Sequence, residues 1–207
     1  MTTANPQIAK WEQRYSTNSQ QKASPPSPLL PQAISGIKPG TALDLACGVG
    51  RHALWLAALG WHVDAVDGSS FAIKQLQQRA VTAGYRDRLA PFVADLEAES
   101  CMFPIRNNHY DLIVDCYFLH RPLFNKIRDG IRPGGLFVAA LHIPAKPGAS
   151  TKHQKREHHS YLLKPGELLA LAEHWQWDIL HSCERSAPPE ALDQLGTAEL
   201  IVRKPNI

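Results

Sequence analysis

Apolar residues along this chain fall into short runs, separated by polar stretches with a different period. Five runs have the length and bounding turn residues of buried strands: 41–46, 61–66, 89–94, 110–116 and 135–142. Between the first strands, apolar residues recur at spacings of three and four up to a glycine, which predicts helices over 51–59 and 69–83. Strands that alternate with helices form a parallel sheet with helices on both faces. The pattern therefore predicts an α/β fold.

The N-terminal region departs from this alternation. Residues 5–15 have the spacing of a short amphipathic helix, with Asn5 as its cap. Residues 16–28 are rich in Ser, Gln and Pro and contain too few apolar side chains to offset the entropy lost on ordering. We therefore expect an N-terminal helix and flexible linker over 1–28, a candidate lid, and one main domain over 29–207.

The C-terminal region changes rhythm as well. The long stretch 143–160 has no periodicity, and loops of that length are commonly lids or disordered segments. A helix is expected from about 165 to 175, followed by strands near 177–183 and 197–203. Because a turn-rich segment separates these two strands, they are predicted to form an antiparallel hairpin added to the parallel sheet.

Composition narrows the class of protein. The chain has 207 residues, 44% of them hydrophobic, which suits one domain with its own core. Its 22 Lys and Arg against 19 Asp and Glu give +3, too small an excess to favour nucleic acid or a membrane surface. No apolar run approaches the roughly 20 residues of a membrane span, and the polar first ten residues do not resemble a secretory signal. We expect a cytoplasmic protein whose four widely spaced cysteines are free thiols, with no metal site.

A glycine-rich turn lies between the first strand and the first helix of the alternation. Small residues there allow close approach of a ligand, and the helix N-terminus offers free N–H groups to an anion. Residues 48–53 match the pattern GxGxxA, and Asp67 ends the next strand 19 residues after Gly48. An acid at that distance is typical of dinucleotide sites. An NAD-dependent oxidoreductase therefore remains an alternative.

Two charged residues of this segment point to another ligand. Asp44 is placed inside a strand, where a carboxylate is costly to bury without a partner. Arg51 falls in the first turn of a helix, where the helix dipole disfavours a cation. The ammonium and carboxylate groups of S-adenosylmethionine would satisfy both, whereas a pyrophosphate would not explain Asp44. Hydrogen bonds from the backbone to Asp44, and an Arg51 that points into water, are the simpler alternatives.

Several segments together resemble a known enzyme family. ALDLACGVGRHALWLA is followed by VDAVDGS, ADLE, YDLIVDCYFLHRPL and IRPGGLFVAALH, with WEQRY at 11–15. This series resembles the class I S-adenosylmethionine-dependent methyltransferases, in particular the small bacterial tellurite-resistance and thiopurine-type group. The resemblance implies a Rossmann-like seven-stranded sheet of order 3-2-1-4-5-7-6 with the last strand antiparallel. The chain differs from that group at Ala46, where relatives have glycine, and at 183–186, where tellurite-type enzymes have a His-Arg pair.

The resemblance also implies roles for individual residues. Asp67 would accept hydrogen bonds from the ribose hydroxyls, Asp95 would face the adenine amino group, and Cys116 would lie under the sulfonium. The full set expected to bind S-adenosylmethionine is Trp11, Arg14, Tyr15, Asp44, Ala46, Cys47, Gly48, Gly50, Arg51, Asp67, Gly68, Ser69, Asp95, Leu96 and Cys116.

Methyl transfer from a sulfonium needs alignment and desolvation, and it needs a base only when the acceptor is still protonated. The candidates for such a base or for substrate contact are His142, His120 and Arg121, which are placed near strand ends. The chain lacks paired carboxylates and reads Asp-Cys-Tyr-Phe at 115–118, in place of the Asn/Asp-Pro-Pro-Tyr of amide and nucleobase methylases. A small-molecule acceptor is therefore expected, with a soft nucleophile such as a thiol favoured and nucleic acid not expected. A non-catalytic S-adenosylmethionine-binding module is a further alternative, and nothing in the sequence indicates an oligomeric state.

Overall fold

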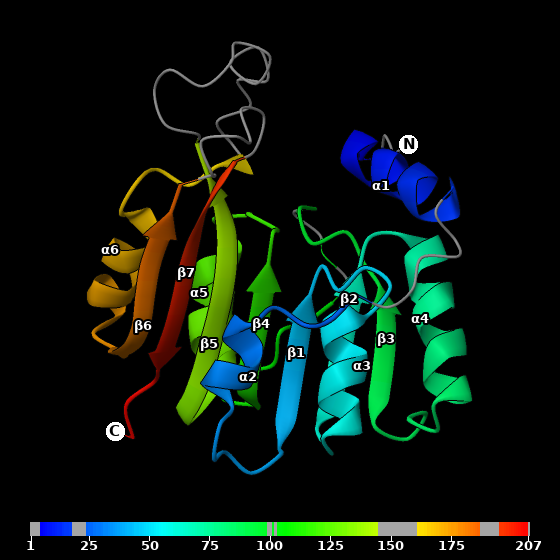
Figure 1. Ribbon diagram of the computed structural model, residues 1–207, viewed down its shortest axis with the longest axis horizontal. Coiled ribbons are helices and arrows are strands. Elements are labelled where there is room, and N and C mark those ends of the chain that lie inside the picture. The colour runs from blue at the N-terminus through cyan, green and yellow to red at the C-terminus, as the bar shows by residue number, and fades with distance from the viewer. Residues whose placement is uncertain are drawn as a thin grey trace.

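The computed structural model describes residues 5–17, 24–98, 101, 103–144, 161–186 and 195–206. Its centre is a seven-stranded sheet of order β3-β2-β1-β4-β5-β7-β6 (Figure 1). The strands are β1 (Thr41–Leu45), β2 (His62–Asp67), β3 (Leu89–Val93), β4 (Tyr110–Cys116), β5 (Ile131–Ile143), β6 (Asp178–Arg185) and β7 (Gly196–Arg203). Strands β1 to β5 pair in parallel, while β7 runs antiparallel to both β5 and β6. The expected α/β fold and strand order are confirmed.

Helices cover both faces of this sheet. They are α1 (Pro6–Thr17), α2 (Leu29–Ala33), α3 (Arg51–Ala58), α4 (Ser70–Thr82), α5 (Leu123–Gly130) and α6 (Glu167–Trp175). Successive strand residues point to opposite faces, so that Ala42 belongs to the core shared with α2, α3 and α4, whereas Leu43 belongs to the core shared with α5 and α6. Helix α1 has no buried residue and lies at the end of the sheet where β1 and β2 finish (Figure 1).

Strand β5 begins earlier than the sequence predicts. It starts at Ile131, four residues before the expected start, and pairs with β4 through a register shift between Tyr110 and Leu112. Pro133 and Gly134, whose φ is 78°, lie within this irregular segment. Pro and Gly are tolerated in a strand at such bulges. The apolar pattern therefore identifies only the regular part of the strand.

The end of the predicted flexible linker is anchored to the domain. Ser27 is buried, and its backbone N–H donates to Nε2 of His52 at 3.2 Å. Residues 18–23, and residues 145–160 of the long stretch before α6, lie outside the described ranges. No helix in the described part of the chain is long and apolar enough to cross a membrane.

Candidate functional site

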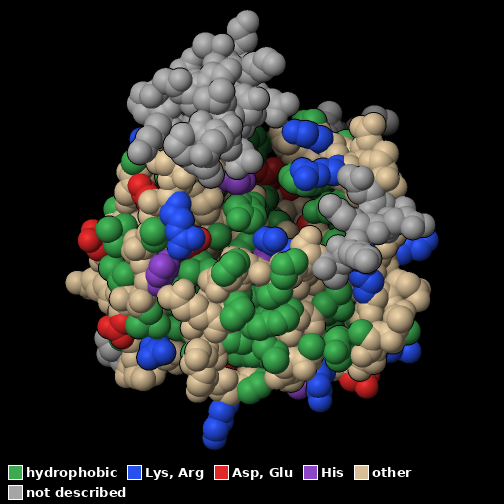
Figure 2. All heavy atoms as spheres, in the orientation of Figure 1, with side chains coloured by type: hydrophobic (Ala, Val, Ile, Leu, Met, Phe, Trp, Pro, Cys, Tyr) green, Lys and Arg blue, Asp and Glu red, His purple; other side chains and the backbone are tan. Residues whose placement is uncertain are grey.

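A cavity of about 750 Å³ opens at the carboxyl ends of β1, β2, β4 and β5. Figure 2 shows the surface hollowed below α1, with acidic side chains inside and Lys and Arg side chains beside the opening. Every residue expected to bind the cofactor lines this cavity except Gly50. Of the three residues suggested for the acceptor chemistry, only His142 lines it.

The turn after β1 shows why Gly50 is the exception. Its φ is 85°, and an added Cβ would lie 2.1 Å from Cδ1 of Leu76 in α4. The missing side chain makes room for helix packing, and the expectation that Gly50 binds the cofactor stays a prediction. Gly48, with φ 54°, does face the cavity, because an added Cβ there would lie 2.6 Å from the hydroxyl of Tyr15. Ala46 is also left-handed at φ 48°, a conformation that glycine adopts at less cost.

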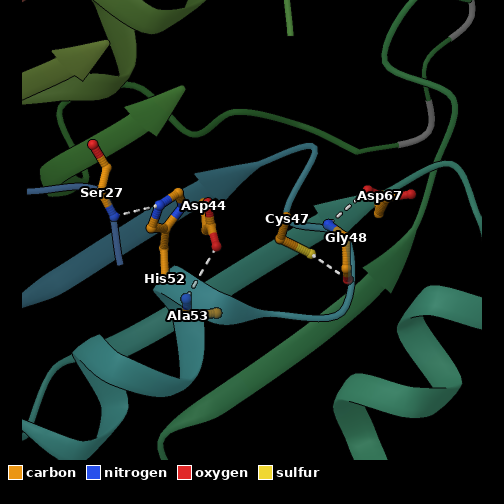
Figure 3. A network of polar contacts seen from close by, with 7 residues as sticks. All are labelled: Ser27, Asp44, Cys47, Gly48, His52, Ala53 and Asp67. Carbon is orange, nitrogen blue, oxygen red and sulfur yellow. Dashed lines mark hydrogen bonds and ion pairs between the residues drawn. The ribbon is translucent and has the colours of Figure 1, made fainter. Parts of the chain in front are cut away.

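Asp44 has partners within the chain. Its side chain is 1% exposed; Oδ2 accepts the N–H of Ala53 at 3.0 Å, and Oδ1 lies 3.7 Å from Nδ1 of His52 (Figure 3). Because Nε2 of His52 accepts the Ser27 N–H, a neutral His52 has its proton on Nδ1, facing Asp44. The simpler alternative, in which backbone satisfies Asp44, is therefore correct in part. A bound cation is not needed to explain the buried carboxylate, although Asp44 remains on the cavity wall.

Asp67 joins two loops at the cavity floor. Its Oδ2 accepts the N–H of Gly48 and its Oδ1 the N–H of Ser69, both at 2.8 Å (Figure 3 shows the Gly48 contact). Burial raises the pKa of Asp67, and the nearby charges of Asp44 and Glu12 raise it further. The two hydrogen bonds lower the pKa, but the net shift is upward. A carboxylate oxygen can accept more than one hydrogen bond. The side chain can therefore hold the loops and still accept hydrogen bonds from the hydroxyl groups of a ligand.

Asp95 follows β3 on the same wall. It accepts the N–H of Glu97 at 2.9 Å and the side-chain amide of Asn5 at 3.2 and 3.3 Å. The same amide donates to Oε2 of Glu97 at 2.9 Å. Asn5 also accepts the N–H of Gln7, so it caps α1 as expected. The residue expected to face adenine is thus also a docking point for α1.

The aromatic residues of α1 face the cavity. Trp11 and Tyr15 stack with ring centroids 5.8 Å apart, and the guanidinium of Arg14 lies 4.8 Å from the Trp11 ring centroid. Burial, together with the charge of Asp67, raises the pKa of Tyr15, so its hydroxyl stays protonated. These contacts agree with a helix that covers the cavity.

Beyond Cys116, the cavity wall contains His142 and Tyr117. His142 is the last residue but one of β5, with its ring centroid 4.8 Å from that of Tyr117, and its Nδ1 has no hydrogen-bond partner among the residues described. Burial lowers the pKa of His142 and keeps the imidazole neutral. The guanidinium of Arg51 lies 5.7 Å from the Tyr117 centroid, so Arg51 contacts an aromatic ring as well as lining the cavity. Burial raises the pKa of the Cys116 thiol and makes it a poor nucleophile.

Sequence reasoning missed Tyr117, which is 47% exposed and has a φ of 67°. Left-handed backbone is costly for a residue with a bulky side chain and often marks a functional site. Its signal in the sequence is an aromatic residue placed directly after a strand that ends at the ligand-binding edge of the sheet.

His120 and Arg121 lie outside the cavity. Nε and Nη2 of Arg121 donate to the two carboxylate oxygens of Glu167 at 2.5 and 2.8 Å, and Nη2 also donates to the carbonyl of Leu162 at 2.9 Å. This ion pair joins the loop before α5 to α6. The carbonyl of His120 accepts the N–H of Leu123 in the turn that begins α5. Both were expected as candidates for base or substrate contact; the structure gives Arg121 a structural role and places both residues off the cavity wall, so a part in the chemistry stays a prediction.

Comparisons with known proteins identify relatives. The family model described as Tellurite resistance protein TehB matches residues 12–151. The crystal structure of TehB from Haemophilus influenzae superposes with a TM-score of 0.70 at 20% identity, over 94% of this chain and 67% of that one. A SAM-dependent methyltransferase from Methanosarcina mazei superposes with a TM-score of 0.67 at 15% identity, over 88% of this chain and 99% of that one.

A curated relative matches over a shorter stretch. Ribosomal RNA small subunit methyltransferase C of Alcanivorax borkumensis is 38% identical over 66 residues, which are 30% of this chain and 20% of that protein. The match thus spans about a fifth of that relative. At the level of family and fold, the resemblance expected from the sequence is confirmed. Because the family model matches well over half of its residues, this chain belongs to the TehB family.

Proposed function

We propose that this protein transfers the methyl group of S-adenosylmethionine to a small-molecule acceptor. The observation that supports this most is the position of Asp67 on the cavity wall. Its two oxygens accept the N–H groups of Gly48 and Ser69 and can still accept hydrogen bonds from ribose hydroxyls. The family and the fold favour the same activity.

The residues present fit this cofactor. Asp67 and the Asp95–Leu96 segment would hold the adenosine, and the turn at Gly48 with Arg51 would hold the methionine portion. When bound, the cofactor supplies an electrophilic methyl group. The chain contributes binding, orientation and exclusion of water, because the displacement needs alignment more than a proton transfer. Helix α1, within the proposed lid at residues 1–28, would cover the cofactor held by the main domain at 29–207.

We propose a soft nucleophile, such as a thiol, as the acceptor. Part of the cavity is lined by Cys116, Tyr117, Phe118, Leu119 and His142, which form a largely apolar and aromatic wall. An ionised thiol attacks without a positioned base, whereas a hydroxyl of high pKa requires one. The neutral imidazole of His142 is the group on this wall that could accept a proton from an acceptor.

Two other acceptor classes are disfavoured. The relative that acts on ribosomal RNA raises nucleic acid as an acceptor, but the net charge of +3 and the sequence Asp-Cys-Tyr-Phe at 115–118 do not favour it. The family is named for tellurite resistance, yet Cys183, Glu184 and Arg185 lie on β6 outside the cavity wall, and Arg185 pairs with Glu199 at 3.0 Å.

We propose that the protein works in the cytoplasm.

The test is an assay of the purified chain with labelled S-adenosylmethionine against matched thiol, phenol and amine series, with tellurite and selenite as additional acceptors. Label transferred to thiols faster than to the matched phenols and amines would support the proposal. Preference for phenols, amines or oxyanions would overturn the thiol preference alone. Binding of S-adenosylhomocysteine without turnover of any acceptor would favour the non-catalytic module, and saturable NAD binding would favour the oxidoreductase.

A further inference from the structure

Glu12 of α1 makes a set of contacts that cofactor and acceptor binding do not explain. Its carboxylate accepts hydrogen bonds from the hydroxyl of Ser69, from the hydroxyl of Ser70 at 2.7 Å, and from the N–H of Phe71 at 3.1 and 3.3 Å. All three donors belong to the N-terminus of α4, which is 57 to 59 residues away in the sequence. Glu12 occupies a position in WEQRY that the family resemblance leaves without a role.

The contact supplies α4 with a second cap. Ser69 already accepts the N–H of Ala72 through its side chain and so caps α4 by itself. Glu12 adds a negative charge where the helix dipole favours one and satisfies the free N–H of Phe71. Although partial burial opposes it, the hydrogen bonds from α4 lower the pKa of Glu12 and keep it ionised. Because α4 keeps Ser69, loss of Glu12 would undock α1 without uncapping α4.

Four residues that dock α1 onto the domain lie on one side of the helix. Asn5, Ile8, Glu12 and Tyr15 follow at spacings of three and four, which place them on the same side of the helix. Ile8 packs on Gly68, where an added Cβ would lie 2.7 Å from its Cδ1, and Tyr15 packs on Gly48. These two glycines flank Asp67 on the cavity wall. Glu12, between Ile8 and Tyr15, provides the charged attachment to the main domain.

The attachment reaches the cofactor-binding carboxylate through one residue. Ser69 donates its hydroxyl to Glu12 and its backbone N–H to Asp67, which in turn holds Gly48. A shift of α1 that breaks the Glu12–Ser69 hydrogen bond would therefore remove one contact of Ser69, the residue whose backbone N–H donates to Asp67. Closure of α1 and ordering of the cofactor cleft would occur together.

We propose that Glu12 is a positioning residue that fastens α1 over the cofactor cleft and slows release of the cofactor. This inference rests on the proposed function, because it takes the cleft to be the S-adenosylmethionine site. Glu12 would dock α1, while Ile8 and Tyr15 would cover Gly68 and Gly48.

The test uses full-length Glu12→Ala and Glu12→Gln, with Gln13→Ala as the matched control on the exposed side of α1. We expect Glu12→Ala to raise the dissociation rate of S-adenosylhomocysteine about tenfold, since it removes several charge-assisted hydrogen bonds. Glu12→Gln, which keeps an acceptor for Phe71 but loses the charge, should fall between Glu12→Ala and wild type. The melting temperature should remain close to that of the control in each case.

Trypsin gives an independent measurement, because Lys10 and Arg14 lie on the same helix. S-adenosylhomocysteine should slow cleavage after these residues in wild type and in Gln13→Ala, but much less in Glu12→Ala. A dissociation rate and a cleavage pattern equal to those of the control would overturn the role of Glu12 while leaving the proposed function intact. A wild-type protein that binds no S-adenosylhomocysteine would instead contradict the proposed function itself.

Discussion

Asp67 accepts the backbone N–H of Gly48 at 2.8 Å, and this hydrogen bond ties the end of β2 to the turn after β1. Residues of both segments line the cavity. Because the same carboxylate also holds Ser69, it has a structural role in addition to the ligand contact expected from the sequence.

We expect Asp67→Ala to lose both affinity and stability. Without the carboxylate, calorimetry should show S-adenosylhomocysteine binding weakened at least tenfold, which corresponds to about 1.4 kcal/mol. Chemical denaturation should show a free energy of unfolding lower by roughly 1 to 3 kcal/mol, because two buried N–H groups lose their acceptor. Asp87→Ala, at an exposed carboxylate on the turn before β3, is the control. Unchanged affinity in Asp67→Ala would rule out the ribose contact.

At Tyr117, substitution by glycine should destabilise the fold less than substitution by alanine. Its φ of 67° favours glycine, so Tyr117→Gly should be more stable than Tyr117→Ala by about 1 kcal/mol, although both lose the same ring contacts. At Val81, an exposed position inside α4, the order should be reversed by a similar amount. Thermal unfolding of the four variants measures both differences. The same order at both positions would show that Tyr117 does not impose backbone strain.

His142 should make stability depend on mildly acidic pH. Its pKa in the folded protein lies below the ordinary value of 6.5, so the unfolded chain binds the proton more readily. The free energy of unfolding should therefore fall as the pH drops through 6.5 toward the folded-state value. His142→Gln should lack this part of the fall when denaturation is measured at about pH 7 and about pH 5. Identical pH dependence in the two proteins would mean that His142 is not held neutral.

Asp115 should act in the opposite pH direction. It is buried at the end of β4, its Oδ1 has no hydrogen-bond partner within the described ranges, and burial raises its pKa well above 3.8. Its contribution to stability is therefore greatest below 3.8 and is lost as the pH rises through the folded-state value. Asp115→Asn cannot ionise, so its stability relative to wild type should increase from about pH 4 to about pH 8. A flat difference for Asp115→Asn would show that this carboxyl ionises normally.

The sequence predicted those features that depend on local pattern. Runs of apolar residues located the strands, and the spacing from Gly48 to Asp67 placed two residues on the same cavity wall. The bulge before Leu136 was not predicted, because it depends on the register between β4 and β5. The packing role of Gly50 was not predicted, because a glycine in a turn can serve close packing as well as ligand approach, and only the position of Leu76 shows the packing.

Contacts between distant residues could not be predicted from local pattern. The pairing of Asp44 with His52 requires the turn geometry that returns the helix to the strand. Glu12 contacts residues 57 to 59 positions away, and Arg121 contacts Glu167. Such partners follow from the packing of whole elements, which a single sequence does not contain.

The most direct test of the account is a calorimetric titration of the full-length chain with S-adenosylhomocysteine, with NAD as the competing ligand. The account predicts saturable binding at one site, no saturable heat with NAD, and a large loss of S-adenosylhomocysteine affinity in Asp67→Ala. Absence of saturable S-adenosylhomocysteine binding, or saturable binding of NAD in its place, would contradict it.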